Sequence, residues 1–167
     1  MIASDVSLRP AREGDMTDVR AIYNHYVLTS TCTFQMEPET SIERQRWYEA
    51  HGPSHPILVA ETKDRIVGWA SLTRFNPRCG YASTVESSVY VHHEAHRKGI
   101  GRALMTDLVG RAASLGYHAI IAGIASDQSA SIGLHERLGF TQVARLREVG
   151  KKFGLWLDVL YLQKMLA

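Results

Sequence analysis

The stretch that decides the fold reads Val89-Tyr90-Val91-His92-His93-Glu94-Ala95-His96-Arg97-Lys98-Gly99-Ile100-Gly101-Arg102-Ala103. An alternating strand ends here, a short basic loop follows, and two glycines open a helical repeat. The first turn of a helix presents backbone N–H groups without intrahelical partners and the positive end of the helix dipole. Glycines let a phosphate approach that backbone closely, and Arg97, Lys98 and Arg102 add positive charge. The stretch indicates a pyrophosphate cradle, the alternative being an ordinary turn with a solvated basic face.

The rest of the chain alternates between strand and helix patterns. In the strand before the cradle, valines 85, 89 and 91 face one side and Glu86, Ser88 and Tyr90 face the other. The pattern predicts a single domain over residues 1–167, of the α/β (α+β) class, with one sheet and helices on both of its faces. The expected strands are Ser7–Pro10, Pro56–Thr62, Ile66–Leu72, Thr84–Val91, Ala119–Ile124, Thr141–Val149 and Leu155–Gln163. Helices are expected from Asp15 (in a capping box with Asp18), over Ser41–Ala50, from Gly99 to Gly116, and from Ser126 or Asp127 to Leu138.

Composition places the chain among ordinary globular proteins. Of 167 residues, 45% are apolar and 22% are charged, and 19 basic against 17 acidic residues leave a net charge of +2. That charge is too small to indicate binding to nucleic acid or to an anionic membrane. Residues Met1 to Asp5 lack the pattern of a signal peptide, and no apolar run is long enough to span a membrane. With Cys32 and Cys79 as the only cysteines, we expect a cytoplasmic protein with two inert thiols.

Four further motifs accompany the cradle in order along the chain. They are Tyr23-Asn24-His25-Tyr26, Thr84-Val85-Glu86-Ser87-Ser88-Val89-Tyr90-Val91, Leu134-His135-Glu136-Arg137-Leu138-Gly139-Phe140 and Gly154-Leu155-Trp156-Leu157-Asp158. With the loop His96-Arg97-Lys98-Gly99-Ile100-Gly101, they resemble the GCN5-related N-acetyltransferases, and more narrowly the phosphinothricin and methionine sulfoximine N-acetyltransferase branch. The resemblance implies the acyl-CoA N-acyltransferase fold. In that fold a twisted mixed sheet of about seven strands has a central parallel pair that splays apart to admit the acetyl-pantetheine arm.

The resemblance also implies acetyl-CoA as the co-substrate. Val89 and Val91 would offer backbone groups to the pantetheine arm, with Tyr90 between them in the same site. The backbone of Arg97, Lys98, Gly99, Ile100, Gly101 and Arg102 would hold the pyrophosphate. Two positions depart from the family pattern. His96 replaces a glutamine or arginine at the start of the loop, and Gln128 stands where an asparagine usually contacts the cofactor arm.

Acetyl transfer to an amine requires a neutral amine, a polarised carbonyl and a protonated leaving thiolate. The resemblance implies that Glu86 accepts the amine proton, directly or through a water, and the alternative is a structural carboxylate bonded to a nearby arginine or tyrosine. His135 stands where many relatives carry a tyrosine near the thiol, so its ring either donates a proton to the sulfur or packs beside the helix. His92, His93 and His96 lack the pattern of a metal site, and no metal is expected.

The acceptor side is inferred from the resemblance. It places the pocket for a small amino-acid-like amine along Phe75, Asn76, Pro77, Arg78 and Tyr81, with Phe34 as a further wall and Glu86, Ser87 and Ser88 beside it. Because no cysteine is placed to form an acetyl-enzyme, we expect direct attack in a ternary complex. Two alternatives stay open: a protein N-terminal acetyltransferase, and a non-catalytic acyl-CoA-binding module in which Glu86 is structural.

The C-terminal run Leu155–Leu162 is apolar on both faces of its strand, more than a solvated edge strand needs. The branch that the chain resembles commonly forms homodimers. We therefore expect a homodimer with this region near the interface.

Overall fold

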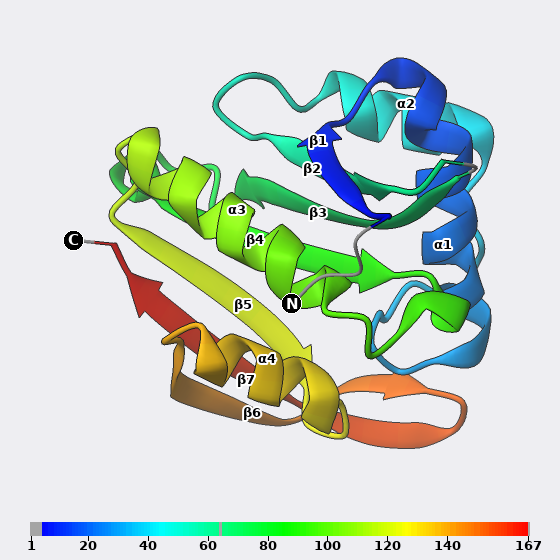
Figure 1. Cartoon of the computed structure of the whole chain (residues 1–167). Coiled ribbons are helices and arrows are strands. Elements are labelled where there is room, and N and C mark those ends of the chain that lie inside the picture. The colour runs from blue at the N-terminus through cyan, green and yellow to red at the C-terminus, as the bar shows by residue number, and fades with distance from the viewer. Residues whose placement is uncertain (1–4, 64, 167) are drawn as a thin grey trace.

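The computed structural model describes residues 5–63 and 65–166. It contains a seven-stranded sheet in the order β1-β2-β3-β4-β5-β7-β6, with helices on both faces (Figure 1). All neighbouring strands are antiparallel except β4 and β5, which are parallel, so the predicted mixed α/β architecture is confirmed. The strands are β1 (Ser7–Pro10), β2 (Ile57–Glu61), β3 (Ile66–Arg74), β4 (Thr84–Val91), β5 (Ala119–Ala125), β6 (Thr141–Lys152) and β7 (Leu155–Met165). The α-helices are α1 (Met16–Thr29), α2 (Ser41–Glu49), α3 (Ile100–Ser114) and α4 (Ser129–Arg137).

Two apolar clusters, one on each face of the sheet, fix the layers. Helix α3 covers one face through Leu104 and Leu108, which are fully buried. Helix α1 covers the opposite face, where Val19 and Ile22 pack with Trp69 of β3. Because successive side chains of a strand point to opposite faces of the sheet, each strand contributes apolar residues to both clusters.

The parallel strands β4 and β5 pair only at their first residues. Residues 84–86 of β4 pair with residues 119–121 of β5, and Glu86 is the last residue of β4 in this register. Beyond it, β4 stays paired with β3 and β5 stays paired with β7. The two central strands therefore separate toward their carboxyl ends, which confirms the predicted splay.

The backbone of β4 faces this opening at alternate residues. In an antiparallel ladder the N–H and C=O of one residue point to the same side, and those of the next residue point to the other. The His92 N–H bonds to the Val67 carbonyl of β3, and the Ser83 carbonyl bonds to the start of β5. Val89 and Val91 are an even number of residues from Ser83, so their N–H and C=O groups point to the same side as the Ser83 carbonyl, toward β5. Beyond Glu86 that side is the opening between β4 and β5.

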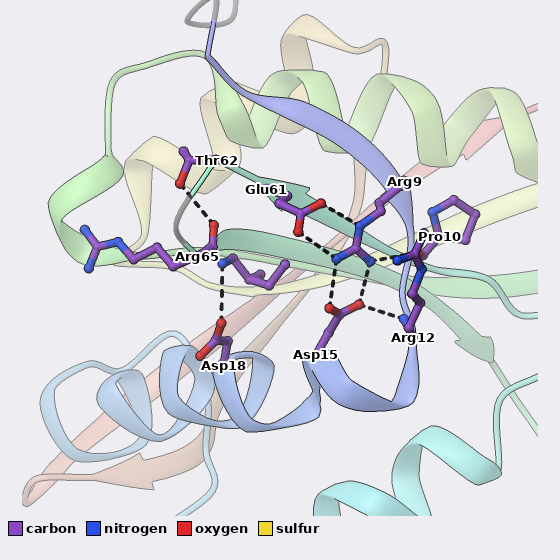
Figure 2. Close-up of polar contacts among 9 residues, drawn as sticks. Arg9, Pro10, Arg12, Asp15, Asp18, Glu61, Thr62 and Arg65 are labelled. Carbon is purple, nitrogen blue, oxygen red and sulfur yellow. Dashed lines mark hydrogen bonds and ion pairs between the residues drawn. The ribbon is translucent and has the colours of Figure 1, made fainter.

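The entry into α1 differs from the prediction. The sequence predicts that Asp15 caps this helix in a box with Asp18. The Asp15 carboxylate instead accepts hydrogen bonds from the Arg12 N–H and from Arg9, whose guanidinium also bonds Glu61 of β2 (Figure 2). Asp18 faces the backbone at the start of β3. The capping prediction is wrong because a guanidinium forms stronger, charge-assisted bonds with a carboxylate than a helix N–H does.

The last two strands extend beyond their predicted ends, to Lys152 and Met165. They are joined by Phe153 and Gly154, whose φ angles of 51° and 79° suit the two-residue turns that match strand twist. Helix α3 ends at Ser114, before the predicted end at Gly116, and this leaves Leu115 45% exposed. The first four residues, for which no signal peptide is expected, and residue 64 between β2 and β3 fall outside the described residues. Within the described ranges, none of the helices has the length and apolar character that a membrane crossing needs.

Candidate active site

A cavity of about 610 Å³ occupies the opening between β4 and β5. The first turn of α3, the helix α4 and the loop after α1 complete its walls. Most of the residues predicted for acetyl-CoA binding line this cavity, together with Ser87 and Ser88 of the predicted acceptor side and the predicted catalytic residue His135: Ser87, Ser88, Val89, Tyr90, Val91, Arg97, Gly99, Ile100, Gly101, Arg102, Gln128 and His135. Glu86 is not one of the lining residues.

The loop before α3 is shaped to receive an anion. Arg97 and Gly99 have positive φ angles of 60° and 77°, which turn the chain sharply into the helix. The Ala103 N–H bonds to the Gly99 carbonyl, and no side-chain hydrogen bond caps the helix. The N–H groups of residues 100–102 therefore have no partner within the helix and sit at its positive end. This arrangement fits the pyrophosphate of acetyl-CoA.

Gly101 and Lys98 occupy different sides of this loop. A Cβ on Gly101 would make ordinary contacts with Leu134 at 3.4 Å and with Val91 at 3.5 Å, so only a side chain larger than alanine would crowd this part of the cavity. Lys98 instead lines a second cavity of about 430 Å³, shared with Lys63. Ile100 lines both cavities, so Lys98 lies on the far side of the same loop from the residues that line the larger cavity.

Gln128, predicted to contact the cofactor arm, is hydrogen-bonded within the protein. Its side-chain N–H group donates to Thr31 Oγ1 at 2.8 Å and to Asp127 Oδ1 at 3.2 Å. Thr31 in turn donates to Asp127 Oδ2 at 2.6 Å. These bonds tie the start of α4 to the loop after α1. Thr31 lies far from Gln128 in sequence and belongs to no motif, so no sequence signal indicated this connection.

Glu86 stands at the point where β4 and β5 separate. Its carboxylate lies beside Gly123 of β5, since a Cβ on that glycine would be 3.6 Å from Glu86 Oε1 and 3.5 Å from the Tyr161 ring. Burial raises the pKa of Glu86, and no hydrogen bond or neighbouring charge opposes that rise. Within the described residues the carboxylate has no arginine or tyrosine partner, the bond that the structural alternative requires. A desolvated, unpaired carboxylate is suited to accept a proton near neutral pH.

His135 is buried in α4, and its ring meets the Phe140 ring edge-on at a centroid distance of 5.0 Å. Its Nδ1 lies 2.8 Å from the Ser131 carbonyl, and because a carbonyl only accepts, Nδ1 carries the proton. Burial lowers the pKa of His135 and so favours the neutral ring, whose Nε2 has no proton to give. This geometry favours the packing role over proton donation to a departing sulfur.

The segment predicted for the acceptor pocket does not line the cavity. Its residues form the connection between β3 and β4, outside the cavity walls: Phe75, Asn76, Pro77, Arg78 and Tyr81. The loop after α1 contributes instead. Cys32 lines the cavity, although the sequence indicated only an inert thiol there. Phe34, also in this loop, lies over Gly150 of β6, where a Cβ would come within 2.7 Å of its ring.

Tyr26 links α1 to the end of β4. Its hydroxyl bonds to the Val91 carbonyl and lies 2.6 Å from His96 Nε2, so one predicted pantetheine contact already has a protein partner. His93 stacks on His25 at a centroid distance of 4.0 Å instead of converging with other histidines on one point. In the portion of the chain that the structure describes, no three potential ligands are grouped to hold a metal ion.

The fold and the cavity together define an acyl-CoA-dependent N-acyltransferase, in which two parallel strands open beside a glycine-rich helix start. Comparison with known proteins makes this more specific. The profile of the acetyltransferase (GNAT) domain matches residues 8–161. The chain belongs to this family and is an acetyltransferase.

Three relatives are informative. The L-methionine sulfoximine/L-methionine sulfone acetyltransferase of Pseudomonas paraeruginosa is 40% identical over 159 residues, which cover 94% of this chain and 92% of the relative. The phosphinothricin acetyltransferase of Sinorhizobium meliloti, solved in complex with acetyl-CoA, superposes with a TM-score of 0.93 at 34% identity, covering 98% of this chain and 89% of that one. The ribosomal-protein-alanine N-acetyltransferase of Brucella melitensis superposes with a TM-score of 0.93 at 38% identity, covering 96% and 99%.

Proposed function

We propose that the protein transfers the acetyl group of acetyl-CoA to the α-amine of a small amino-acid-like molecule by direct attack in a ternary complex. The observation that carries the proposal is the position of Glu86, whose desolvated carboxylate lies where β4 and β5 separate. An amine that approaches the opening between these strands arrives within reach of this base.

Each wall of the cavity has a part in this reaction. Acetyl-CoA, when bound, supplies an activated thioester carbonyl and a thiol leaving group. The N–H groups at the start of α3 hold its pyrophosphate, and the backbone of Val89 and Val91 orients its arm. Glu86 removes one proton from the ammonium, the neutral amine nitrogen bonds to the carbonyl carbon, and the C–S bond breaks as the nitrogen releases its second proton to solvent and becomes an amide. Neutral His135 shapes the wall, and the thiolate takes its proton from solvent.

The substrate class is supported by the relatives. Relatives along nearly the whole chain are named for methionine sulfoximine and phosphinothricin, both amino-acid analogues with a free α-amine. A peptide acceptor is the competing possibility, because one relative is named for ribosomal-protein alanine.

Thiol release from acetyl-CoA tests the proposal. The acceptors are L-methionine sulfoximine, L-methionine sulfone, L-phosphinothricin and a short peptide with an N-terminal alanine, and Glu86→Gln serves as the comparison enzyme. Turnover of the amino-acid analogues and not of the peptide is the expected result. Turnover of the peptide alone would make the protein an N-terminal acetyltransferase, whereas binding of acetyl-CoA without any thiol release would make it a binding module.

We also propose that the protein is a cytoplasmic homodimer of single-domain subunits. Strand β6 lies at the edge of the sheet, and an edge strand offers unpaired backbone groups to a second copy. Exposed apolar side chains lie on both faces of β6, β7 and their turn: Val143, Leu146, Val149, Phe153, Leu155 and Trp156. These six residues are called the hairpin patch below. The two cysteines are unpaired thiols, in keeping with a reducing compartment.

A further inference from the structure

Lys152, the last residue of β6, is a buried lysine that the reaction described above does not use. Only 2% of its surface is exposed, yet no carboxylate in the described part of the chain pairs with it. Its ammonium donates to the Ser30 carbonyl and to the Thr33 carbonyl, both at 2.7 Å. A buried charge that forms no ion pair must be held by hydrogen bonds or dipoles, so these two carbonyls define what Lys152 does.

Both carbonyls belong to the loop that follows α1. Ser30 is the C-terminal cap of that helix, so the ammonium also faces the negative end of the helix dipole. Figure 1 shows the turn end of the β6–β7 hairpin beside this loop, although more than a hundred residues separate them in sequence. Lys152 therefore fastens the loop at two points, one on each side of Cys32.

The fastened loop forms part of the cavity. Cys32 lines it, and the neighbouring Thr31 bonds to Asp127 and Gln128 at the start of α4. Thr33 is held a second time, because its hydroxyl lies 2.8 Å from the Tyr23 hydroxyl. Each residue from 30 to 33 thus has a fixed partner or a place in the cavity wall, and the segment predicted from the family pattern, 75–81, does not reach the cavity.

The same hairpin also positions Phe34. Its ring lies against Gly150, two residues before Lys152, at a distance that leaves no room for a Cβ. The ring is 37% exposed, so one side packs on the hairpin and the other remains available. Phe34 is therefore positioned by β6, and Cys32 lies between two residues whose carbonyls Lys152 holds.

We infer that Lys152 is a positioning residue for the acceptor amine, because it holds the loop of residues 30–34 as the acceptor wall of the cavity. This inference rests on the proposed function. Lys152 has no hydrogen bond to β4 or to the start of α3, the elements proposed to hold the pantetheine arm and the pyrophosphate, and it reaches Gln128 only through Thr31 of the loop. Loss of the lysine should therefore weaken the acceptor and spare acetyl-CoA.

The test is Lys152→Met, which keeps the length of the side chain and removes its donors. The matched control is Lys151→Met, at the exposed neighbouring lysine. With L-methionine sulfone as the acceptor, we expect its KM to rise about tenfold or more, and the calorimetric Kd of acetyl-CoA to change by less than about threefold. The Lys151→Met enzyme should match the wild type in both constants.

A second variant decides the matter if Lys152→Met does not fold. In Gly150→Ala the new Cβ displaces the tip of the Phe34 ring and leaves Lys152 in place. The KM for L-methionine sulfone should again rise, by about threefold or more, with the melting temperature within about 2 °C of the wild type. Unchanged acceptor KM in the folded variants, or equal losses for acceptor and acetyl-CoA, would overturn the positioning role. A wild-type enzyme inactive toward every amine would instead overturn the proposed function, and the positioning role with it.

Discussion

The half-buried carboxylate of Glu86 lowers the stability of the folded protein when it is ionised, and the same burial makes it a stronger base. Burial raises its pKa, so the ionised form is less stable in the folded protein than in water. For an acid with a raised folded pKa, ionisation at neutral pH reduces the free energy of unfolding. Replacing Glu86 by glutamine should therefore leave the melting temperature unchanged or higher while it removes the base.

We expect Glu86→Gln to lower kcat/KM for the amine by about 10²–10⁴-fold, the range typical of a lost general base. The deficit should shrink as pH rises, because the amine then loses its proton without help. In the wild type, activity should fall as pH drops through the raised pKa of Glu86, since the protonated carboxyl accepts nothing. Rates measured from pH 6 to 9 test both points. A deficit that stays constant with pH would mean that Glu86 binds the substrate ammonium and does not take its proton.

His135 should behave as a packing residue. Its Nδ1–H is engaged by Ser131, and its ring fills space beside Phe140. Removing a buried ring leaves a cavity, so His135→Ala should reduce the free energy of unfolding by roughly 2–4 kcal/mol. The loss in kcat should be about tenfold or less, because a thiol leaving group of pKa near 8.5 needs little help near neutrality. Disappearance of a limb of the kcat–pH profile in this variant would show that the ring transfers a proton.

At the scale of secondary elements, substitutions at the start of α3 should change the affinity for acetyl-CoA and leave the KM of the amine nearly unchanged. A side chain at Gly101 would press on Leu134 and Val91, where the walls of the cavity approach each other. We expect Gly101→Val to raise the Kd of acetyl-CoA by about tenfold or more and to leave the KM of the amine nearly unchanged. Gly110→Val, on the same helix but facing open space, is the matched control. Calorimetry with acetyl-CoA gives both values, and equal affinity in the two variants would place the pyrophosphate elsewhere.

The elements that could be predicted from sequence are those whose pattern is local. Alternation in β4 and the helical period after Gly99 indicate a strand, a loop and a helix without knowledge of any partner. The cofactor loop follows from the same local logic, since glycines and an open helix start suffice to suggest an anion site.

The elements that could not be predicted depend on contacts between distant residues. Asp15 reads as a helix cap because the pattern contains no sign that Arg9 and Glu61 will surround it. Lys152 lies beyond the predicted end of its strand at Val149, and no local pattern indicates that the turn at Phe153 brings it to the end of α1. Cys32 lines the cavity, and no local pattern around it in the sequence indicates that position.

At the scale of the whole molecule, the sheet has two different edges. One edge is β1, a short strand of four residues tied to α1 through Arg9. The other is β6, a strand of twelve residues beside the hairpin patch. Long exposed edges tend to pair with another chain unless charge or distortion prevents it. Two shifts of register, between Gln142 and Ala144 and between Leu146 and Gly150, interrupt the pairing of β6 with β7 and leave the paired stretches 141–142, 144–146 and 150–152.

We expect two copies to associate through this edge as a dimer with two-fold symmetry, in which every contact between the two subunits occurs twice. Light scattering of the 18.7 kDa chain at micromolar concentration should give twice that mass. Trp156 is 60% exposed within the hairpin patch, and Trp156→Lys places a charge there, so the variant should sediment as a monomer. Ile42 on α2 is 62% exposed but lies outside the patch, and Ile42→Lys should remain dimeric.

Because the patch shares its hairpin with Lys152, the monomeric variant should also bind the acceptor less tightly. A wild-type chain that scatters as a monomer would contradict the pairing through β6.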